Sequence, residues 1–479
     1  MIVHVSDSNS ITMHGWPSSF TTVITHRLHE HHATNYKALR PRWLVHMPGP
    51  PVSGSFVLGI SDLSWELLSR FATVDALSNL EELLASGVSG PLELPAPSNG
   101  PASWTSLATG ARPDGHQVYG TADVDAAGRR HRLTSVDRRR PPVWRTVSPS
   151  FVAGVPMTHP VRPVEGVLVP GPPTPDDSTV RTYPRSFEAE LDATIPEYVV
   201  DHPTSNEELA DHLRSRRLLL HRFMDASAGW SLQWMVISIA KGPRRIDPAE
   251  VIDRLQPLDD VLGEVMDYVE RQSANLFVVS APRVADADRW THLQETLMRG
   301  GFTSGDDTGR PGRLERVVER LGRSIGRDAE SDETAFAVGN AVFINDTARF
   351  QHGVVDPADV PTVKEDVAAH LGRQAAYRVL DGNRRGSEDR IAPDLVAVPT
   401  RTGLLYTADR DNEDDPRGVF AACGPNIRRG HLVNPRASDV VPTLLHSQLR
   451  AIPSSVDGCV LDVFSPSSPI AAQSPTVNT

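Results

Sequence analysis

The chain has 479 residues and a formal net charge of −12, so it can bury a large core but has the wrong sign of charge for a general binder of nucleic acid or anionic membranes. Its only two cysteines, Cys423 and Cys459, exclude a disulfide framework and favour two free buried thiols in a cytoplasmic protein. The apolar runs are too short to cross a bilayer, and the N-terminus lacks the pattern of a signal peptide.

Residues 1–50 show no steady hydrophobic period, and they carry a cluster of four histidines: His26, His29, His31 and His32. A metal site there would need further ligands, and only Glu30 accompanies the cluster. Because a His-rich tract by itself is only a compositional signal, we predict a mobile N-terminal extension over residues 1–50.

The core begins with the apolar run Phe56–Ile60, which predicts a buried strand. Ser61 and Asp62 follow this strand directly. The leucine spacing in Leu77–Leu84 predicts a helix, with Gly87 as its C-terminal cap. A second helix, which packs against the sheet, is expected to contain Trp104-Thr105-Ser106.

Strands and helices alternate farther along the chain. A helix is predicted from a capping box at Thr204–Glu208 to Phe223, with Leu209, Leu213, Leu220 and Phe223 on one face. Buried strands at 232–240 and 275–280 flank a helix at 248–271, which Pro257 bends or divides. This alternation is typical of a mostly parallel sheet with helices on both faces.

Several boundaries complete the predicted organisation. One α/β domain covers residues 51–465, with loop insertions at 121–205 and 303–333, and a helix within the second insertion at 313–323. The run Ala341–Asn345 is expected to return to the sheet, and a helix follows at 361–371. Residues 466–479, which are small and polar, are predicted to form a disordered tail.

Four motifs in this order suggest a family. They are Gly59-Ile60 before Ser61-Asp62, then Pro101-Ala102-Ser103-Trp104-Thr105-Ser106, then Thr109-Gly110, then Pro113-Asp114-Gly115-His116. The framework resembles the type I phosphodiesterase/nucleotide pyrophosphatase family of the alkaline phosphatase superfamily, over about residues 55–464. The resemblance implies an alkaline-phosphatase-like α/β fold. It also implies a reaction at two metal ions about 4 Å apart, surrounded by Asp and His ligands, with a Thr or Ser nucleophile beside one metal.

The residues at the implied chemical positions differ from the family pattern. Ser61 stands where the first metal-binding Asp is expected, and Asp62 follows one place later. Gly100 stands where the nucleophile is expected, with Ser98 and Asn99 nearby.

Later ligand positions are replaced as well. Lys241 follows the second strand where an Asp is expected, and the family's Ser-Asp-His-Gly reads Ser280-Ala281-Pro282-Arg283. Asp414 and Asp415 lie near the position of the last metal-binding His.

These departures lead to two hypotheses of different kinds. The first is a family member without the two-metal site and nucleophile, which works as a non-hydrolytic binding protein or as a metal-independent enzyme acting on an anionic small molecule. The alternative is an active phosphodiesterase or phosphatase with a rearranged site that uses Zn or Mn. The first needs no cofactor, and a protein partner or homo-oligomer is compatible with either.

The candidate residues carry over position by position from the resemblance. The catalytic candidates are Asp62, Ser61, Ser98 and Lys241, and the ligand-binding candidates are Asn99, Ser103, Arg283 and His116. Asp62, Asp414 and Asp415 are the metal-ligand candidates of the alternative. His116 has a second, structural interpretation, since the family's His at this motif is structural.

Overall fold

The structure, a computed structural model, describes the following parts of the chain: residues 2–5, 11–14, 54–71, 77–96, 98, 100–174, 181–195, 198, 206–224, 229–239, 248–282, 289–303, 333–374, 377–382, 391–399 and 417–478. The chain divides into two compact units, residues 1–50 and residues 51–479. In the first unit, β1 (Ile2–Val5) pairs antiparallel with β2 (Ile11–His14). The histidine cluster of that unit lies outside the described residues.

The second unit is built on an eight-stranded sheet with the order β16-β4-β15-β10-β3-β9-β7-β8. Its strands are β3 (Ser55–Ser61), β4 (Val88–Leu92), β7 (Ser150–Ala153), β8 (Gly166–Val169), β9 (Leu232–Ser238), β10 (Asn275–Ala281), β15 (Gly418–Cys423) and β16 (Gly430–His431). Of these eight strands, β15 alone runs against the others. The mostly parallel sheet predicted from the sequence is confirmed.

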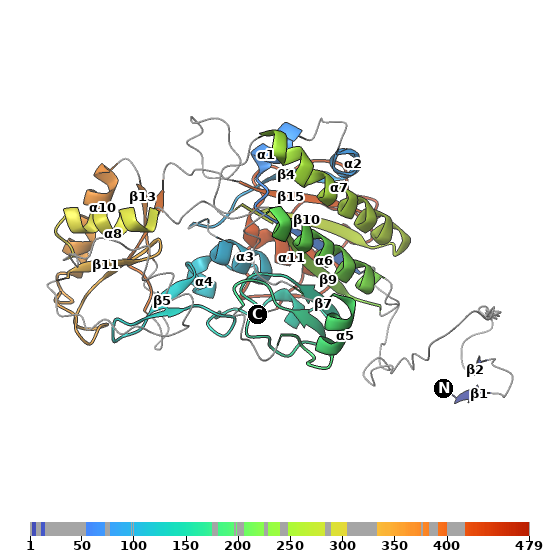
Figure 1. The fold of residues 1–479 in the computed structure, drawn as a ribbon, viewed down its shortest axis with the longest axis horizontal. Coiled ribbons are helices and arrows are strands. Elements are labelled where there is room, and N and C mark those ends of the chain that lie inside the picture. The colour runs from blue at the N-terminus through green and yellow to red at the C-terminus, as the bar shows by residue number, and fades with distance from the viewer. Residues whose placement is uncertain are drawn as a thin grey trace. The chain divides into compact units, whose positions relative to one another are not determined.

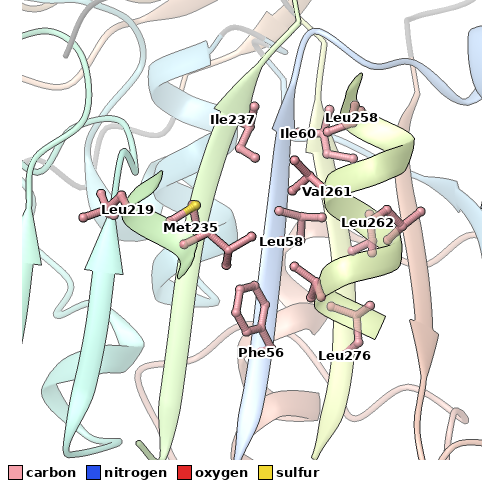
Figure 2. Close-up of a cluster of buried hydrophobic side chains, with 14 of the residues drawn as sticks. Phe56, Leu58, Ile60, Leu219, Met235, Ile237, Leu258, Val261, Leu262 and Leu276 are labelled. Carbon is pink, nitrogen blue, oxygen red and sulfur yellow. The ribbon is translucent and has the colours of Figure 1, made fainter. Parts of the chain in front are cut away.

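One face of this sheet is covered by α2 (Ser78–Ser86), α6 (Asn206–Met224) and α7 (Pro248–Arg271). Alternate residues of β3, namely Phe56, Leu58 and Ile60, point toward these helices and pack with Val261 and Leu262 of α7 (Figure 2). Strand side chains alternate between faces, so Val57 belongs to the core on the other side. Pro257 lies inside α7, and the helix is not divided there.

The opposite face is covered by α3 (Gly100–Thr109) and α11 (Val440–Ser447), as Figure 1 shows. Trp104 of α3 lies directly over Gly59 of β3, where an added Cβ would come within 2.8 Å of the indole ring. A residue without a side chain at 59 therefore lets the helix approach the sheet closely. The prediction that Trp104 and its neighbours form a helix packed on the sheet is confirmed.

A second, antiparallel sheet has the order β11-β12-β14-β13, and it lies around the labels α8, α10 and β11 in Figure 1. Its elements are β11 (Ala335–Val338), β12 (Ala341–Ile344), β13 (Tyr377–Asp381), β14 (Leu395–Pro399), α8 (Arg289–Arg299) and α10 (Val360–Arg373). These elements share their own apolar core. The prediction that 341–345 returns to the main sheet is therefore wrong, whereas the helix predicted at 361–371 is confirmed.

Shorter elements fill the connections. They are α1 (Trp65–Phe71), α4 (Pro113–His116), β5 (Ala122–Val124), β6 (Arg130–Arg132), the 3₁₀ helices η1 (Val143–Arg145) and η2 (Ala437–Asp439), α5 (Phe187–Thr194), β17 (Ile452–Pro453) and β18 (Val477–Asn478). Residues 121–205 are thus not only loop, because β7 and β8 are strands of the main sheet.

Three further predictions meet different outcomes. The disordered tail is wrong: β18 pairs with β17, and the side chain of Ile470 is buried. The cysteines form no disulfide, but only Cys423 is buried and Cys459 is exposed. Most of the predicted insertion at 303–333, with its helix, lies outside the described residues.

Within the described part of the chain, no helix is both long and apolar enough to cross a membrane.

Candidate functional site

The candidate site begins at the carboxyl ends of the three central strands. In the parallel ladders β10–β3 and β3–β9, Ala281, Ser61 and Ser238 stand in one row. Open α/β sheets bind ligands at this edge, because the loops that follow the strands diverge there. The row therefore marks where ligands would be met, and it presents two hydroxyls and a methyl group.

Asp62, the residue after this row, is the one candidate carboxylate whose placement the structure describes. Its backbone has φ of +74°, a left-handed conformation that Asp tolerates better than most residues. Its N–H donates to the carbonyl of Ala281 at 3.2 Å, and its Oδ2 accepts a bond from the Ser238 hydroxyl at 3.1 Å. With 1% of its surface exposed, Asp62 is fixed between the ends of β3, β9 and β10.

The hydroxyl candidates are placed differently from one another. Ser61 is buried at the end of β3, and Ser98 is half-buried shortly before α3. Gly100, at the implied position of the nucleophile, is the first residue of α3. Ser103 lies in the first turn of α3, fully buried, and its Oγ has no hydrogen-bond partner among the described residues. The structure thus brings Ser61 together with Asp62 and Ser238. In contrast, Ser98 lies in the chain that leads to α3, and Ser103 lies in α3 itself.

His116 is a buried structural residue that links two helices, rather than a group that faces a ligand. It is fully buried, its Nδ1 accepts the N–H of Val118 at 3.1 Å, and its Nε2 bonds the Ser106 hydroxyl at 2.9 Å. Because Nδ1 accepts, Nε2 carries the proton in the neutral ring. Burial, and then the positive charge of Arg138, lowers the pKa of His116 to about 3. The ring stays neutral near pH 7 and ties α4 to α3, which favours the structural interpretation over ligand binding.

Two polar residues of α6 were missed in the sequence, His212 and Arg216. His212 is buried, and its Nε2 accepts the N–H of Ser238 at 3.1 Å, so it holds the backbone at the end of β9 while the hydroxyl of the same residue bonds Asp62. The signal is present in the sequence, because 212 and 216 fall three and seven residues after Leu209 on the predicted buried face.

Arg216 is a fully buried cation. Only 1% of its surface is exposed, its guanidinium lies over the ring of Tyr198 at 4.5 Å, and no carboxylate among the described residues pairs with it. Burial lowers the pKa of Arg216 and raises that of Tyr198. Gly154, after β7, makes room for this arrangement: it has φ of +70°, and an added Cβ would lie 2.7 Å from the carbonyl oxygen of Val236 and 3.4 Å from Arg216 Nε.

Five other candidates lie outside the described residues: Asn99, Lys241, Arg283, Asp414 and Asp415. Among the residues that the structure does describe, no group of three or more His, Cys, Asp or Glu side chains could hold a metal ion. At the strand ends, the described oxygen and nitrogen donors include one carboxylate, Asp62, and one imidazole, His212, whose Nε2 is already engaged. These described groups do not by themselves form the ligand set of two metal ions.

Comparison with known proteins supports the interpretation of the motifs. The sequence pattern of the type I phosphodiesterase/nucleotide pyrophosphatase family matches residues 56–420. The chain belongs to this family. None of the curated proteins compared with it matches.

Two solved structures are similar to this chain. The alkaline phosphatase PafA aligns with a TM-score of 0.54 and 14% sequence identity, over 88% of this chain and 100% of that one. Murine ectonucleotide pyrophosphatase/phosphodiesterase 5 aligns with a TM-score of 0.49 and 12% identity, over 86% of this chain and 100% of that one. The first likeness establishes the predicted alkaline-phosphatase-like fold, and at this identity it establishes the fold alone.

Proposed function

We propose that this family member binds an anionic small molecule at the carboxyl edge of its main sheet, without the two-metal phosphoryl-transfer chemistry of the family. The observation that carries the proposal is the row Ala281, Ser61 and Ser238, followed by Asp62. Ser61 and Ala281 occupy positions where the family pattern implies ionised ligands, and Ser238 adds a second hydroxyl beside them. The described carboxylate there is held by the Ser238 hydroxyl and by the backbone of Ala281.

We propose an anion as the ligand because a basic residue follows each of two strands that end at this edge. Lys241 follows β9 by three residues, and Arg283 follows β10 by two. Ammonium and guanidinium groups suit phosphate and carboxylate. A binding protein needs only this recognition, whereas a metal-independent enzyme would in addition use Asp62 or Ser61 for proton transfer.

The first experiment measures metal content and turnover together. Protein purified without chelators is analysed for bound elements, and hydrolysis of bis(p-nitrophenyl) phosphate is followed with added Zn²⁺ or Mn²⁺. We expect well under one metal ion per chain and no chelator-sensitive hydrolysis. About two metal ions per chain with hydrolysis abolished by chelator would overturn the proposal in favour of an active phosphodiesterase with a rearranged site.

The second experiment tests the anion. Binding of p-nitrophenyl phosphate is measured by calorimetry for the native protein, for the variants Lys241→Ala and Arg283→Ala, and for the control Arg214→Ala, whose side chain is 69% exposed and pairs with Asp211. We expect each of the first two changes to weaken binding about tenfold, the typical value of one charge-assisted hydrogen bond, while the control binds as the native protein does. Equal affinity in all four proteins would exclude the proposed anion site.

A cytoplasmic location is part of the same proposal. Its support is the pair of free thiols, Cys423 and Cys459, since free cysteines are common where the thiol pool is reducing.

A further inference from the structure

A second basic feature lies on the face of the sheet that α3 covers. It is a pocket of about 300 Å³ between residues 135–145, which end in η1, the β7–β8 connection and β8. Five arginines line it: Arg138, Arg139, Arg140, Arg145 and Arg162. We call it the arginine pocket. Among the described residues that line it there is no carboxylate.

Backbone carbonyl oxygens hold the guanidinium groups of Arg138 and Arg145. Arg138 donates from Nε to the carbonyl of Arg140 and from Nη1 to that of Met157, both at 3.1 Å. Arg145 reaches the carbonyl of Pro163 at 3.4 Å, and Arg140 Nε is buried without a partner among the described residues. These contacts orient the cations but do not compensate their charges.

Burial and neighbouring positive charges both act on Arg138. Burial, followed by the positive charges of Arg162 and Arg145, lowers the pKa of Arg138 to about 10. The group remains charged at neutral pH, so the folded protein carries a cost for holding these cations close together. A bound anion would remove that cost.

The pocket contrasts with the rest of the chain. Several other arginines of the chain pair with acids, as Arg181 does with Asp192 and Arg217 with Glu264. The whole chain has a net charge of −12, so a pocket whose described lining has five arginines and no acid differs from the overall composition. Such a local excess of positive charge is typical of an anion-binding site.

The inner wall of the arginine pocket is apolar and rigid. Trp144 and Leu168 are each 2% exposed, and the Trp144 ring meets the Trp234 ring edge to face with 5.7 Å between their centroids. Thr158 adds a hydroxyl, which already donates to Val155 and accepts from Gly171. A fixed, apolar back with charged groups at the mouth is the usual form of a small-molecule site.

We propose that the arginine pocket is a second binding site, for a small molecule that carries at least two phosphate groups. Arginine forks match phosphate oxygens in pairs, and several forks around one pocket suit more than one phosphate. The volume of about 300 Å³ is at the lower limit for ligand pockets and fits a compact polyanion. The net negative charge of the chain disfavours an extended polyanion such as a nucleic acid, which would touch surface well beyond the pocket.

The arginine pocket is separate from the anion site proposed at the carboxyl ends of β3, β9 and β10, which we call the strand-end site, and it does not depend on that site. Asp62, Ser61 and Ser238 do not line the arginine pocket. Its arginine segment is nevertheless anchored to α3, because the N–H of Arg139 donates to the carbonyl of His116 and His116 bonds Ser106 of that helix. Occupation of the pocket would stiffen this connection.

The test uses Arg162, whose side chain is exposed and makes no hydrogen bond or ion pair with any described residue, so its removal leaves the fold intact. Thermal unfolding and calorimetry are run with sodium triphosphate, pyrophosphate, orthophosphate and sulfate at matched ionic strength. The proteins are the native chain, Arg162→Gln, the double variant Arg145→Gln/Arg162→Gln, and the control Arg373→Gln, an exposed arginine of α10.

For the native protein and the control, we expect triphosphate and pyrophosphate to bind at least tenfold more tightly than orthophosphate or sulfate. Arg162→Gln should lose about tenfold in triphosphate affinity, and the double variant about a hundredfold. Without ligand, both variants should melt at or above the native temperature, because repulsion is relieved.

Three results would overturn the proposal. They are no binding of triphosphate or pyrophosphate by the native protein, equal affinities of Arg162→Gln and Arg373→Gln, and a short single-stranded oligonucleotide that binds more tightly than triphosphate with the same dependence on Arg162. Retained binding at the strand-end site in Arg162→Gln, measured with p-nitrophenyl phosphate, would separate the two sites.

Discussion

The Ser238 hydroxyl donates to Asp62 Oδ2 at 3.1 Å, and this bond joins the ends of two adjacent strands that are 176 residues apart in the sequence. The Asp62 carboxylate lies one residue beyond the position that the family pattern implies for a metal ligand, and its backbone has a left-handed conformation. Two features of Asp62 therefore bear on stability: its tolerance of a positive φ and its acceptance of the Ser238 hydrogen bond. Substitutions can test the two separately.

Replacing Asp62 with Ala should lower the free energy of unfolding by about 1–3 kcal/mol, because the buried Ser238 hydroxyl loses its acceptor and Ala disfavours positive φ. Asp62→Asn should stay within about 1 kcal/mol of the native protein, since Asn tolerates this conformation and retains an acceptor oxygen. Urea unfolding measures both changes. A loss in Asp62→Asn as large as in Asp62→Ala would show that the negative charge itself stabilises the site.

The pKa of His116 predicts a pH dependence of stability. Its folded-state pKa of about 3 lies below the ordinary value of 6.5, so the unfolded chain binds the proton more readily. The stabilisation is thus fully present above pH 6.5 and is lost as the pH falls toward 3. The slope from this one group is about 1.4 kcal/mol per pH unit.

His116→Gln isolates this contribution, because Gln is neutral throughout and its amide can still bond Ser106. The variant should be less stable than the native protein at pH 7, by about 1–3 kcal/mol for a lost buried acceptor at Val118 N–H. The difference should shrink steadily between pH 6 and pH 4, as measured by chemical unfolding at several pH values. A constant difference over that range would mean that His116 titrates in the folded protein as it does in the unfolded chain.

The close approach of α3 to the sheet predicts a cost for any side chain at Gly59. In Gly59→Ala the new methyl group would lie 2.7 Å from Val236 Cγ2 and 2.8 Å from the Trp104 ring, so one of them must shift. We expect a loss of about 1–3 kcal/mol, the usual cost of overpacking a core. The matched control is Gly372→Ala in α10, where nothing described lies within 4 Å of the added Cβ and a gain of about 0.5–1 kcal/mol is expected. Calorimetric melting should move in opposite directions for the two variants.

The sequence predicted the central strands well because each is a continuous apolar run, buried on both faces. Phe56–Ile60 and Asn275–Ser280 became β3 and β10 with shifts of one residue at their ends. The strands β7 and β8 are only four residues long and lie among prolines, so their periodic signal was too short to separate from loop. Ala341–Ile344 has the composition of a central strand, and only its pairing with β11 and β14 shows that it belongs to a different sheet.

The candidate site was predictable in position but not in geometry. The motif order indicated Ser61 and Asp62 at a strand end, and both lie there. The bond from Ser238 and the support from His212 could not be predicted, because they join β9 and α6 to β3 over long sequence separations. Of the five arginines of the arginine pocket, only Arg138, Arg139 and Arg140 are adjacent in the sequence, and the fold of residues 134–168 brings Arg145 and Arg162 to them.

The second sheet depends on a buried ion pair between Arg349 and Asp394. Asp394 is fully buried, its Oδ2 accepts the N–H of Ile344 at 2.8 Å and a bond from Arg349 Nη2 at 2.6 Å, and Arg349 also pairs with Asp346. Arg349→Met would remove the guanidinium group that pairs with both of these buried carboxylates, which costs about 3–5 kcal/mol. Hydrogen exchange should accelerate in β12 and β14, while β3 and β10 keep their protection, because the damage lies in a separate apolar core.

The control Arg299→Met removes an exposed pair with Glu295 and should change stability by less than about 0.5 kcal/mol. Uniform loss of protection in both sheets would show instead that the two cores unfold as one cooperative unit.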